Sequence, residues 1–545
     1  MKTETLSKND VIELEITGFT SEGSGVGHYN GQAVFVAGAA AGDTVEALII
    51  KAKKNYAIGK IQHILKASAD RIQPDCGVFP RCGGCAYRHI TYEAEKRLKY
   101  EKVQSALQRL GHLDVTPEPI VGADSPDRYR NKAQYPVAMS NGRLMTGFYA
   151  PFSHRVTDCK NCLLQPEEFG AILRTIAKWS ERYKIPSYDE TTGKGLLRHI
   201  YIRKGFETNE IMVCLVINGE RIFKQSDLIN ALLKTNENIK TVLINENTEN
   251  TNVILGKKCT TLYGKGYIED ILCGKRFRIS PLSFYQVNHD QAQKLYEKAA
   301  EYALSGKCET LLDLYCGAGT IGLTMVHKVK KLIGVEIVEE AIKDAEINAK
   351  LNNTTNARFI CADAAKAAEM LEKEGLRPDT VILDPPRKGC DDELLSSLVR
   401  MNPETIVYVS CDPASLARDC AKLKEHGYEI EECTPFDLFP RTVHVETVVQ
   451  LVRKNPDTHI DFEISLDEFD LTASEAKATY QEIKDYVLDK FGLKVSSLYI
   501  SQVKTKCGII ERENYNKGEG KSRVPQCPPE KEKAIINALR HFKMI

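Results

Sequence analysis

The sequence lacks the features that would assign its class at once. No apolar run approaches the roughly 20 residues that a membrane-spanning helix needs, and MKTETLSKND at the start has no apolar stretch like that of a secretion signal. The 74 basic and 74 acidic residues cancel, so overall charge gives no argument for nucleic-acid binding. No internal repeat or low-complexity segment is evident. We expect a cytoplasmic protein of about three to four domains that does not contact membranes.

Cysteine, in contrast, is abundant, with 17 residues in 545. Cytoplasmic thiols stay reduced, so clustered cysteines indicate metal binding or catalysis rather than disulfides. Cys76, Cys82 and Cys85 are closely spaced, and Cys159 or Cys162 of DCKNC could supply a fourth thiolate. Four thiolates suit an iron–sulfur cluster or a zinc ion, and the spacing alone does not decide between them.

The chain divides into four predicted regions. Residues 1–66 contain short β-branched or alternating segments separated by glycine-rich turns, which predicts a small closed β-barrel of OB-like size. Residues 67–280 read as a mixed α/β domain that contains the clustered cysteines. Residues 455–545 read as a helical extension with a helix over residues 471–492 and two more after it. That extension is either an additional RNA-binding element or a helical packing appendage.

Residues 281–454 show the alternation of a doubly wound, Rossmann-like parallel sheet. The predicted buried strands are TLLDLY, KLIGVE, ARFICAD, DTVILD and TIVYVS, with VHVETVVQLVRK as the last strand. Ligands of such sheets bind at the carboxyl ends of the strands. The residues that end these strands are therefore the first candidates for a functional site.

A glycine-rich turn after the first of these strands predicts a nucleotide-like cofactor. Gly317 and Gly319 follow Asp313 and precede a helix, and Glu336 ends the next strand, where a carboxylate can hold ribose hydroxyls. The run GAGTIG keeps a dinucleotide open on spacing alone, whereas the G-x-G core favours S-adenosylmethionine. Asp363 ends the third strand and could reach an adenine or simply cap the following helix.

The segment ILDPPRKG places Asp384 at the end of the fourth strand. An acid-Pro-Pro turn at this position is typical of S-adenosylmethionine-dependent enzymes that act on planar rings, and the prolines stiffen the loop. Enzymes that methylate amino groups usually carry an aromatic residue next, which stacks on a flipped base. Arg387 occupies that position here, which argues against amine chemistry.

Cys411 ends the fifth strand and should emerge at the same edge. The helix that begins near Pro413 should lower the thiol pKa through its dipole. A thiolate beside a methyl donor can add to C6 of uracil, which makes C5 nucleophilic. The C5 proton then needs an acceptor, and His444 and Glu446 should share one face of the last strand. We prefer Glu446, because a carboxylate can stay ionised beside the ring.

The motifs SFYQVN, DLYCGAGT, DPPRKG, SCDPASLARD and FPRTVHVE, in this order, resemble the RNA uracil-C5 methyltransferase family over about residues 9–453. The resemblance implies that S-adenosylmethionine contacts Gln286, Tyr315, Glu336 and Asp384, beside Gly317 of the turn, with Asp363 near the adenine. It also implies Cys411 as nucleophile and Glu446 as proton acceptor.

Further features resemble the 23S ribosomal RNA (RumA-type) branch of that family. They imply a TRAM-type RNA-binding barrel and a [4Fe–4S] cluster held by Cys76, Cys82, Cys85 and Cys162. They also imply that Arg130, Asn131 and Lys132 contact the flipped nucleotide or its phosphates. The predicted function is the formation of 5-methyluridine in 23S rRNA by a monomer. A tRNA uracil-C5 methyltransferase and a non-catalytic iron–sulfur RNA-binding protein are the alternatives.

Overall fold

The computed structural model describes residues 6–454, 480–507, 527–542 and 544. The chain forms two compact units, residues 1–456 and residues 457–545, each with its own core. Within the described ranges, we find no helix that combines the length and the apolar content needed to cross a bilayer.

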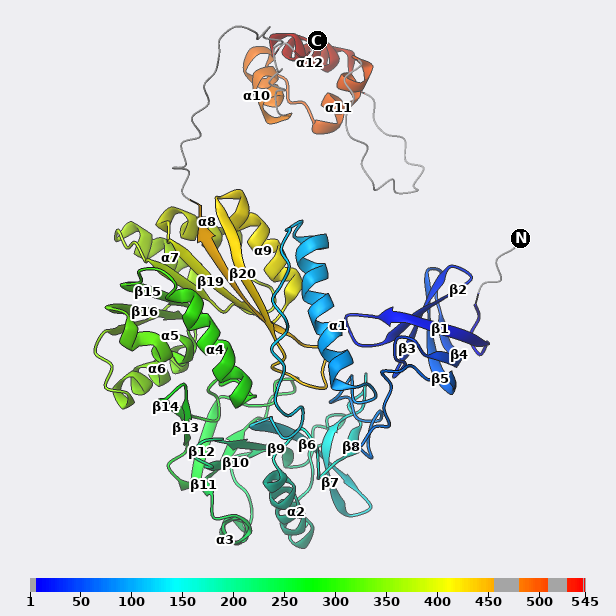
Figure 1. The fold of residues 1–545 in the computed structure, drawn as a ribbon, viewed down its shortest axis with the longest axis vertical. Coiled ribbons are helices and arrows are strands. Elements are labelled where there is room, and N and C mark those ends of the chain that lie inside the picture. Colours follow the sequence, from blue (N-terminus) through cyan, green and yellow to red (C-terminus); the bar gives the residue numbers. More distant parts are fainter. Residues whose placement is uncertain (1–5, 455–479, 508–526, 543, 545) are drawn as a thin grey trace. The chain divides into compact units, whose positions relative to one another are not determined.

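A closed five-stranded barrel forms the N-terminal part of the first unit (Figure 1). Its strands follow the order β1-β2-β3-β5-β4 and span β1 (Val11–Phe19), β2 (Gly25–Tyr29), β3 (Gln32–Ala37), β4 (Thr44–Ala52) and β5 (Tyr56–Lys66). The predicted barrel is confirmed, but β2 lies in the glycine-rich run that we expected to be a turn. Gly27 permits this strand, since a Cβ there would lie 2.3 Å from the carbonyl oxygen of Glu15.

A second region is built on a seven-stranded sheet of order β12-β11-β10-β9-β6-β7-β8, preceded by the long helix α1 (Tyr92–Ser105). Helices α2 (Glu167–Arg182) and α3 (Gln225–Thr235) pack on it through one apolar core. A hairpin of β13 (Ile268–Leu272) and β14 (Lys275–Ile279) follows. The sheet strands are β6 (Lys132–Ser140), β7 (Arg143–Tyr149), β8 (Val156–Asp158), β9 (Leu197–Lys204), β10 (Ile211–Ile217), β11 (Ile239–Glu246) and β12 (Lys258–Gly264).

A third region contains the predicted doubly wound sheet, in the order β17-β16-β15-β18-β19-β21-β20. Five strands are parallel: β15 (Thr310–Leu314), β16 (Lys331–Glu336), β17 (Ala357–Cys361), β18 (Thr380–Leu383) and β19 (Thr405–Ser410). The last two, β20 (Tyr428–Phe436) and β21 (Glu446–Arg453), are antiparallel to their neighbours. The sequence prediction missed β20, which occupies the sheet edge and leaves β21 inside the sheet.

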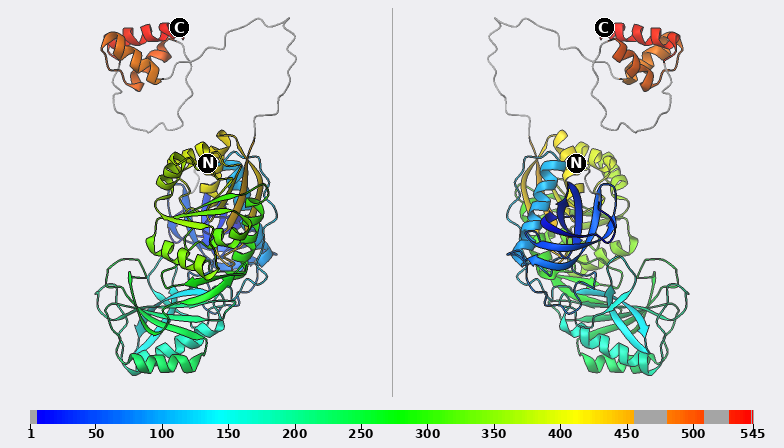
Figure 2. Two further views of the ribbon diagram at one scale, coloured as in Figure 1. Left: turned by 90° about the vertical axis from the view of Figure 1, so that its left-hand side faces the viewer. Right: turned by 90° about the vertical axis from the view of Figure 1, so that its right-hand side faces the viewer.

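Helices cover both faces of this sheet (Figure 2) because strand side chains alternate between the faces. Leu312 and Leu314 pack with one set of helices, α7 (Ala364–Lys373), α8 (Asp392–Met401) and α9 (Pro413–Glu425). Leu311 packs on the opposite face with α4 (His289–Ala303) and α5 (Thr320–Met325). Helix α6 (Glu339–Leu351) connects β16 to β17. Two apolar layers therefore hold the strands rigidly and fix where their ends lie.

The second unit contains α10 (Tyr480–Phe491), α11 (Ser497–Lys506) and α12 (Pro529–His541). Ile483, Val487, Ile500, Ile535 and Leu539 are completely buried and share one apolar cluster. The predicted helical extension is confirmed over these ranges. The first part of the helix predicted over residues 471–492 lies outside the described residues.

Candidate active site

The antiparallel pairing of β19 with β21 places Cys411 opposite Glu446. Ser410 pairs with Thr447, and Cys411 and Glu446 are the next residues outward on their strands. Cys411 is half-buried and Glu446 is 5 % exposed. The predicted nucleophile and the predicted proton acceptor therefore lie side by side, although 35 residues separate them in the chain.

The loop of residues 384–390, here called the DPP loop, begins beside these two residues. Leu383 pairs with Tyr408 in the parallel register, so Asp384 leaves the sheet next to β19. The charges of Asp384 and Arg387 both act on Cys411 and on Glu446. The structure thus gathers one thiol, two carboxylates and one guanidinium at the carboxyl edge of the sheet.

The Cys411 thiol is harder to ionise than an ordinary cysteine, contrary to our prediction. Burial raises its pKa to about 11, the charges of Glu446 and Asp384 add to the effect, and Arg387 opposes it. The following helix does not compensate, because Asp412 caps it. The Asp412 carboxylate accepts hydrogen bonds from the backbone N–H groups of Ala414 and Ser415 at 3.0 and 2.9 Å.

The two candidates for the proton acceptor differ in position. Strand β21 begins at Glu446, so His444 lies in the preceding loop and does not share a strand face with Glu446, as we had predicted. Burial raises the Glu446 pKa well above its ordinary value, and the charge of Asp384 raises it further. Burial and neighbouring cations lower the His444 pKa to about 4. Glu446 therefore takes up a proton far more readily than a surface carboxylate does, contrary to our reason for preferring it, that it would stay ionised.

Arg418 and Asp419 fasten the DPP loop to α9, a role that the sequence did not reveal to us. The Asp419 carboxylate is completely buried and accepts hydrogen bonds from the Cys390 N–H (2.8 Å) and the Tyr408 hydroxyl (2.7 Å). Arg418 donates to Asp419 and to the Lys388 carbonyl, both at 2.8 Å. The segment LARD (residues 416–419) contained a signal for this role, because a carboxylate on the buried face of a helix needs hydrogen-bond partners.

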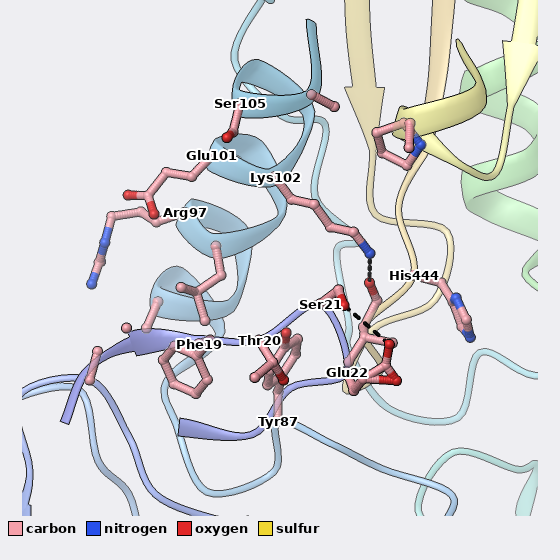
Figure 3. A pocket seen from close by; sticks show the side chains of 18 of the residues that line it. Phe19, Thr20, Ser21, Glu22, Tyr87, Arg97, Glu101, Lys102, Ser105 and His444 are labelled. Atoms are coloured by element: carbon pink, nitrogen blue, oxygen red, sulfur yellow. Dashed lines mark hydrogen bonds between the residues drawn. The ribbon is translucent and has the colours of Figure 1, made fainter. Parts of the chain in front are cut away.

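A long groove leads to Cys411 from the side of the barrel. Its volume is about 990 Å³. Residues 17–22 of the barrel form one wall, and α1 forms the other (Figure 3). Arg97, Lys102 and Arg109 of α1 line it, and Arg387 and His444 lie where it reaches Cys411. Lys102 donates a hydrogen bond to the Val443 carbonyl at 3.2 Å, which ties α1 to the loop before Glu446 (Figure 3).

The predicted cofactor turn adopts a conformation that suits close ligand approach. Gly317 has φ of +55°, and a Cβ built there would meet nothing within 4 Å. The Gly317 N–H donates to one Glu336 carboxylate oxygen at 3.2 Å, and the Val338 N–H donates to the other at 2.9 Å. Ile337 is 63 % exposed beside this carboxylate. The turn therefore combines open space, a fixed acid and an uncovered apolar side chain, which fits an adenosine group.

Of the remaining cofactor candidates, Tyr315 is adjacent to this turn. Leu314 pairs with Leu383, so Tyr315 and Asp384 follow paired residues on neighbouring strands. Gln286 is 7 % exposed in the segment before α4. Asp363 caps α7 through hydrogen bonds from the N–H groups of residues 365 and 366. That capping is one of the two roles we considered for Asp363; contact with an adenine stays a prediction.

The clustered cysteines surround one cavity of about 140 Å³, here called the cysteine cavity. Cys76, Cys82, Cys85, Cys159 and Cys162 all line it. Backbone N–H groups point at two of the sulfurs: Gly84 donates to Cys82 at 3.4 Å, and residues 164 and 165 donate to Cys162. Among the described residues, no three His, Cys, Asp or Glu side chains are placed to hold a single metal ion.

A buried arginine faces the cysteine cavity. Arg88 lines it, is 2 % exposed and hydrogen-bonds to the Cys85 sulfur. Asp75 and Asp127 accept hydrogen bonds from the same guanidinium at 2.7 and 2.5 Å. The guanidinium can donate a hydrogen bond into the cavity, while the two carboxylates balance its charge. The five thiols are the ligand type that a metal–sulfide cluster takes.

The chain entering β6, residues 130–132, links the cysteine cavity to the segment containing Gln286. The Arg130 N–H donates to the Leu164 carbonyl at 3.0 Å. Asn131 is completely buried, and its side-chain amide donates to the Gln286 carbonyl at 2.8 Å. Burial lowers the Lys132 pKa to about 8. Asn131 thus holds the two loops together, and its contact with RNA stays a prediction.

The fold and the residues at the carboxyl edge of the doubly wound sheet define the class of the protein. A doubly wound sheet with antiparallel β21, a glycine-rich turn after β15 and an acid at the end of β16 is the architecture of S-adenosylmethionine-dependent methyltransferases. The model of the tRNA (Uracil-5-)-methyltransferase family matches residues 95–454, and that of the TRAM domain matches residues 7–61. The chain belongs to this family of S-adenosylmethionine-dependent RNA uracil-C5 methyltransferases.

Individual relatives agree with this assignment. The chain is similar to proteins described as uncharacterized RNA methyltransferases from Clostridium tetani (44 % identical; 82 % of this chain and 96 % of the relative) and Halalkalibacterium halodurans (42 %; 83 % and 98 %). A solved structure, Pyrococcus abyssi tRNA (uracil-54, C5)-methyltransferase in complex with S-adenosyl-L-homocysteine, matches with a TM-score of 0.66 and 26 % identity. That match covers 81 % of this chain and 99 % of the other.

Proposed function

We propose that the protein forms 5-methyluridine in 23S rRNA through a covalent bond between Cys411 and C6 of the target uracil. The observation that carries the proposal is the placement of Cys411 opposite Glu446, where the long groove ends. A nucleophile and a proton acceptor on neighbouring strands can act on the two adjacent ring carbons, C6 and C5.

The proposed reaction has four steps. The Cys411 thiol loses its proton to solvent in the groove, and the thiolate adds to C6, which places an electron pair on C5. C5 then takes the methyl group. Glu446 removes the proton from C5, and the electrons of the C–H bond restore the C5–C6 double bond as the Cys411 thiolate leaves. The raised pKa of Glu446 suits this role, because a buried carboxylate gains by accepting the proton.

S-adenosylmethionine supplies an electrophilic methyl group when it is bound. We propose that Gly317 and Glu336 hold its adenosine part, with Asp363 near the adenine. Tyr315, Asp384 and Gln286 would orient the remainder at the end of β18. The support is the adjacent position of Tyr315 and Asp384 at the ends of neighbouring strands, together with the open space at Gly317.

We further propose that Cys76, Cys82, Cys85 and Cys162 hold a [4Fe–4S] cluster. The shared cavity, the N–H groups directed at sulfur and the buried Arg88 support it. A brown absorbance that disappears in Cys82→Ser is expected. Zinc in a colourless wild-type protein would instead assign the site to a zinc ion. Cys308→Ser is a matched control, because this half-buried thiol lies outside the cysteine cavity.

For the substrate, the second candidate is a tRNA. The match to the tRNA enzyme of Pyrococcus abyssi extends over 81 % of this chain, so a barrel and a methyltransferase domain do not by themselves select ribosomal RNA. We favour 23S rRNA because the motifs of residues 76–89 and 158–166 resemble that branch. We also propose that Arg130 and Lys132 contact the flipped nucleotide or its phosphates, and that the protein acts as a monomer.

Transfer of label from tritiated S-adenosylmethionine tests the substrate. Separate incubations contain 23S rRNA and total tRNA, and nucleosides are analysed after digestion. We expect labelled 5-methyluridine from 23S rRNA. Label in tRNA alone would assign the second candidate, and label in N-methylated bases would refute uracil-C5 chemistry.

Two variants test the covalent mechanism with the same RNA. Cys411→Ala should abolish methyl transfer and the covalent adduct with 5-fluorouridine RNA. Glu446→Gln should accumulate an adduct with ordinary RNA, because the methylated ring keeps its C5 proton and the thiolate does not leave. Cys390→Ala is a matched control thiol on the DPP loop. Normal turnover by Cys411→Ala would refute the mechanism.

A further inference from the structure

Phe152 is a fully exposed aromatic residue in the turn between β7 and β8. Its relative exposure is 107 %, so no other residue of the first unit covers the ring. Its φ is +57°, in the left-handed region that asparagine and glycine occupy more readily than aromatic residues. An exposed aromatic ring in an unfavourable backbone conformation does not stabilise the isolated chain. This suggests that Phe152 contacts another molecule.

Hydrogen bonds fix the turn that presents this ring. Within it, the Ala150 N–H donates to the Arg155 carbonyl at 2.9 Å, and the Ser153 N–H donates to the Ala150 carbonyl at 3.1 Å. The Gly83 N–H of the cysteine-rich segment donates to the Tyr149 carbonyl at 2.9 Å. The turn therefore rests on the wall of the cysteine cavity and holds Phe152 outward in a defined position.

The charges around Phe152 favour an anionic partner. Arg155 and Arg81 are both exposed, and across the described parts of the chain neither forms an ion pair with a carboxylate. The Thr157 hydroxyl donates to the Arg81 carbonyl at 3.1 Å, which brings Arg81 beside the same hairpin. His154 differs, since Glu190 accepts its hydrogen bond at 2.6 Å. Two guanidinium groups whose charge is not neutralised thus accompany one uncovered aromatic ring.

We propose that Phe152 stacks on an unpaired base of the substrate RNA while Arg155 and Arg81 contact the neighbouring phosphates. Single-stranded RNA offers both partners at once, since each nucleotide has a flat base and an anionic phosphate. The hairpin lies on the same side of the first unit as the barrel (Figures 1 and 2). The inference rests on the proposed function and adds a contact outside the groove that leads to Cys411.

Fluorescence gives a direct test, because the chain has one tryptophan, Trp179, which is 4 % exposed. Phe152→Trp would introduce an exposed indole at the turn. Adding the RNA that the wild type methylates should quench this emission, with saturation at the concentration that saturates methylation. Phe223→Trp is the matched control, because Phe223 is 62 % exposed elsewhere in the same region, and we expect no quenching there.

Phe152→Ala should weaken RNA binding about tenfold, the scale expected for the loss of one base stacked on an aromatic ring. The KM for RNA should rise and kcat should persist, and Phe152→Tyr should restore binding. The inference would be overturned if Phe152→Ala bound RNA with wild-type affinity, or if RNA did not quench the emission of Phe152→Trp. Methylation by the wild type would still uphold the proposed function in either case. Loss of activity on ribosomal particles but not on naked RNA would also overturn the inference and assign Phe152 to a protein contact instead.

Discussion

The ionisation of Cys411 gives the sharpest test of the active-site electrostatics. With a pKa of about 11, about one Cys411 in a thousand is a thiolate at pH 8. An ordinary cysteine, with a pKa of about 8.5, is about one quarter ionised at that pH. Because the thiolate is the reactive form, Cys411 in the free enzyme should be alkylated roughly two hundredfold more slowly than an ordinary exposed thiol.

Alkylation by iodoacetamide, followed by mass spectrometry of the peptide containing Cys411, measures this rate. Since the pKa is raised, the thiolate fraction should grow about tenfold per pH unit between about pH 7 and 9.5. Arg387→Gln removes a charge that lowers the thiol pKa, so it should slow alkylation. Glu446→Gln removes a charge that raises it, so it should accelerate alkylation.

A rate that levels off near pH 7 would refute this reasoning, because it would mean that the thiol is already ionised there. Equal rates in the two variants would show that neither charge acts on Cys411. Cys361, which is exposed, serves as the internal reference thiol in the same digest.

Three further substitutions test how the fold supports the site. Asp419→Asn should lower the free energy of unfolding in urea by about 3 kcal/mol and lower kcat, because the charge that binds Arg418 is lost. The control Asp392→Asn, at an exposed carboxylate, should change neither the free energy of unfolding nor kcat. Gly389→Ala should slow methyl transfer, since φ is +76° and its Cβ would lie 2.4 Å from Asp419. Lys99→Met should cost about 3–5 kcal/mol in the same unfolding measurement, as it leaves the buried Asp437 without its cation and leaves Glu95 with Arg441 alone.

Much of the fold followed from local patterns in the sequence. The strands β15, β16, β18 and β19 are short, largely apolar runs with a polar residue at or just after their ends, and this pattern survives because both faces of the sheet are covered there. The position of Asp384 and Cys411 at one edge then follows from parallel pairing alone. β20 escaped prediction because the three acidic residues in YEIEECTPF leave no continuous apolar run, and the first half of this edge strand is largely exposed.

The sequence by itself determined which residues could do chemistry: a cysteine and an acid after parallel strands, and a glycine-rich turn. The tertiary structure decided their environment. Antiparallel insertion of β21 places Glu446 opposite Cys411, and burial then raises the pKa of both groups. For Cys411 this is the reverse of the expected helix effect. The tertiary structure also set Phe152 outside the core and Asn131 within it. The physical reason is that burial and charge proximity depend on strand order and packing, which no local pattern records.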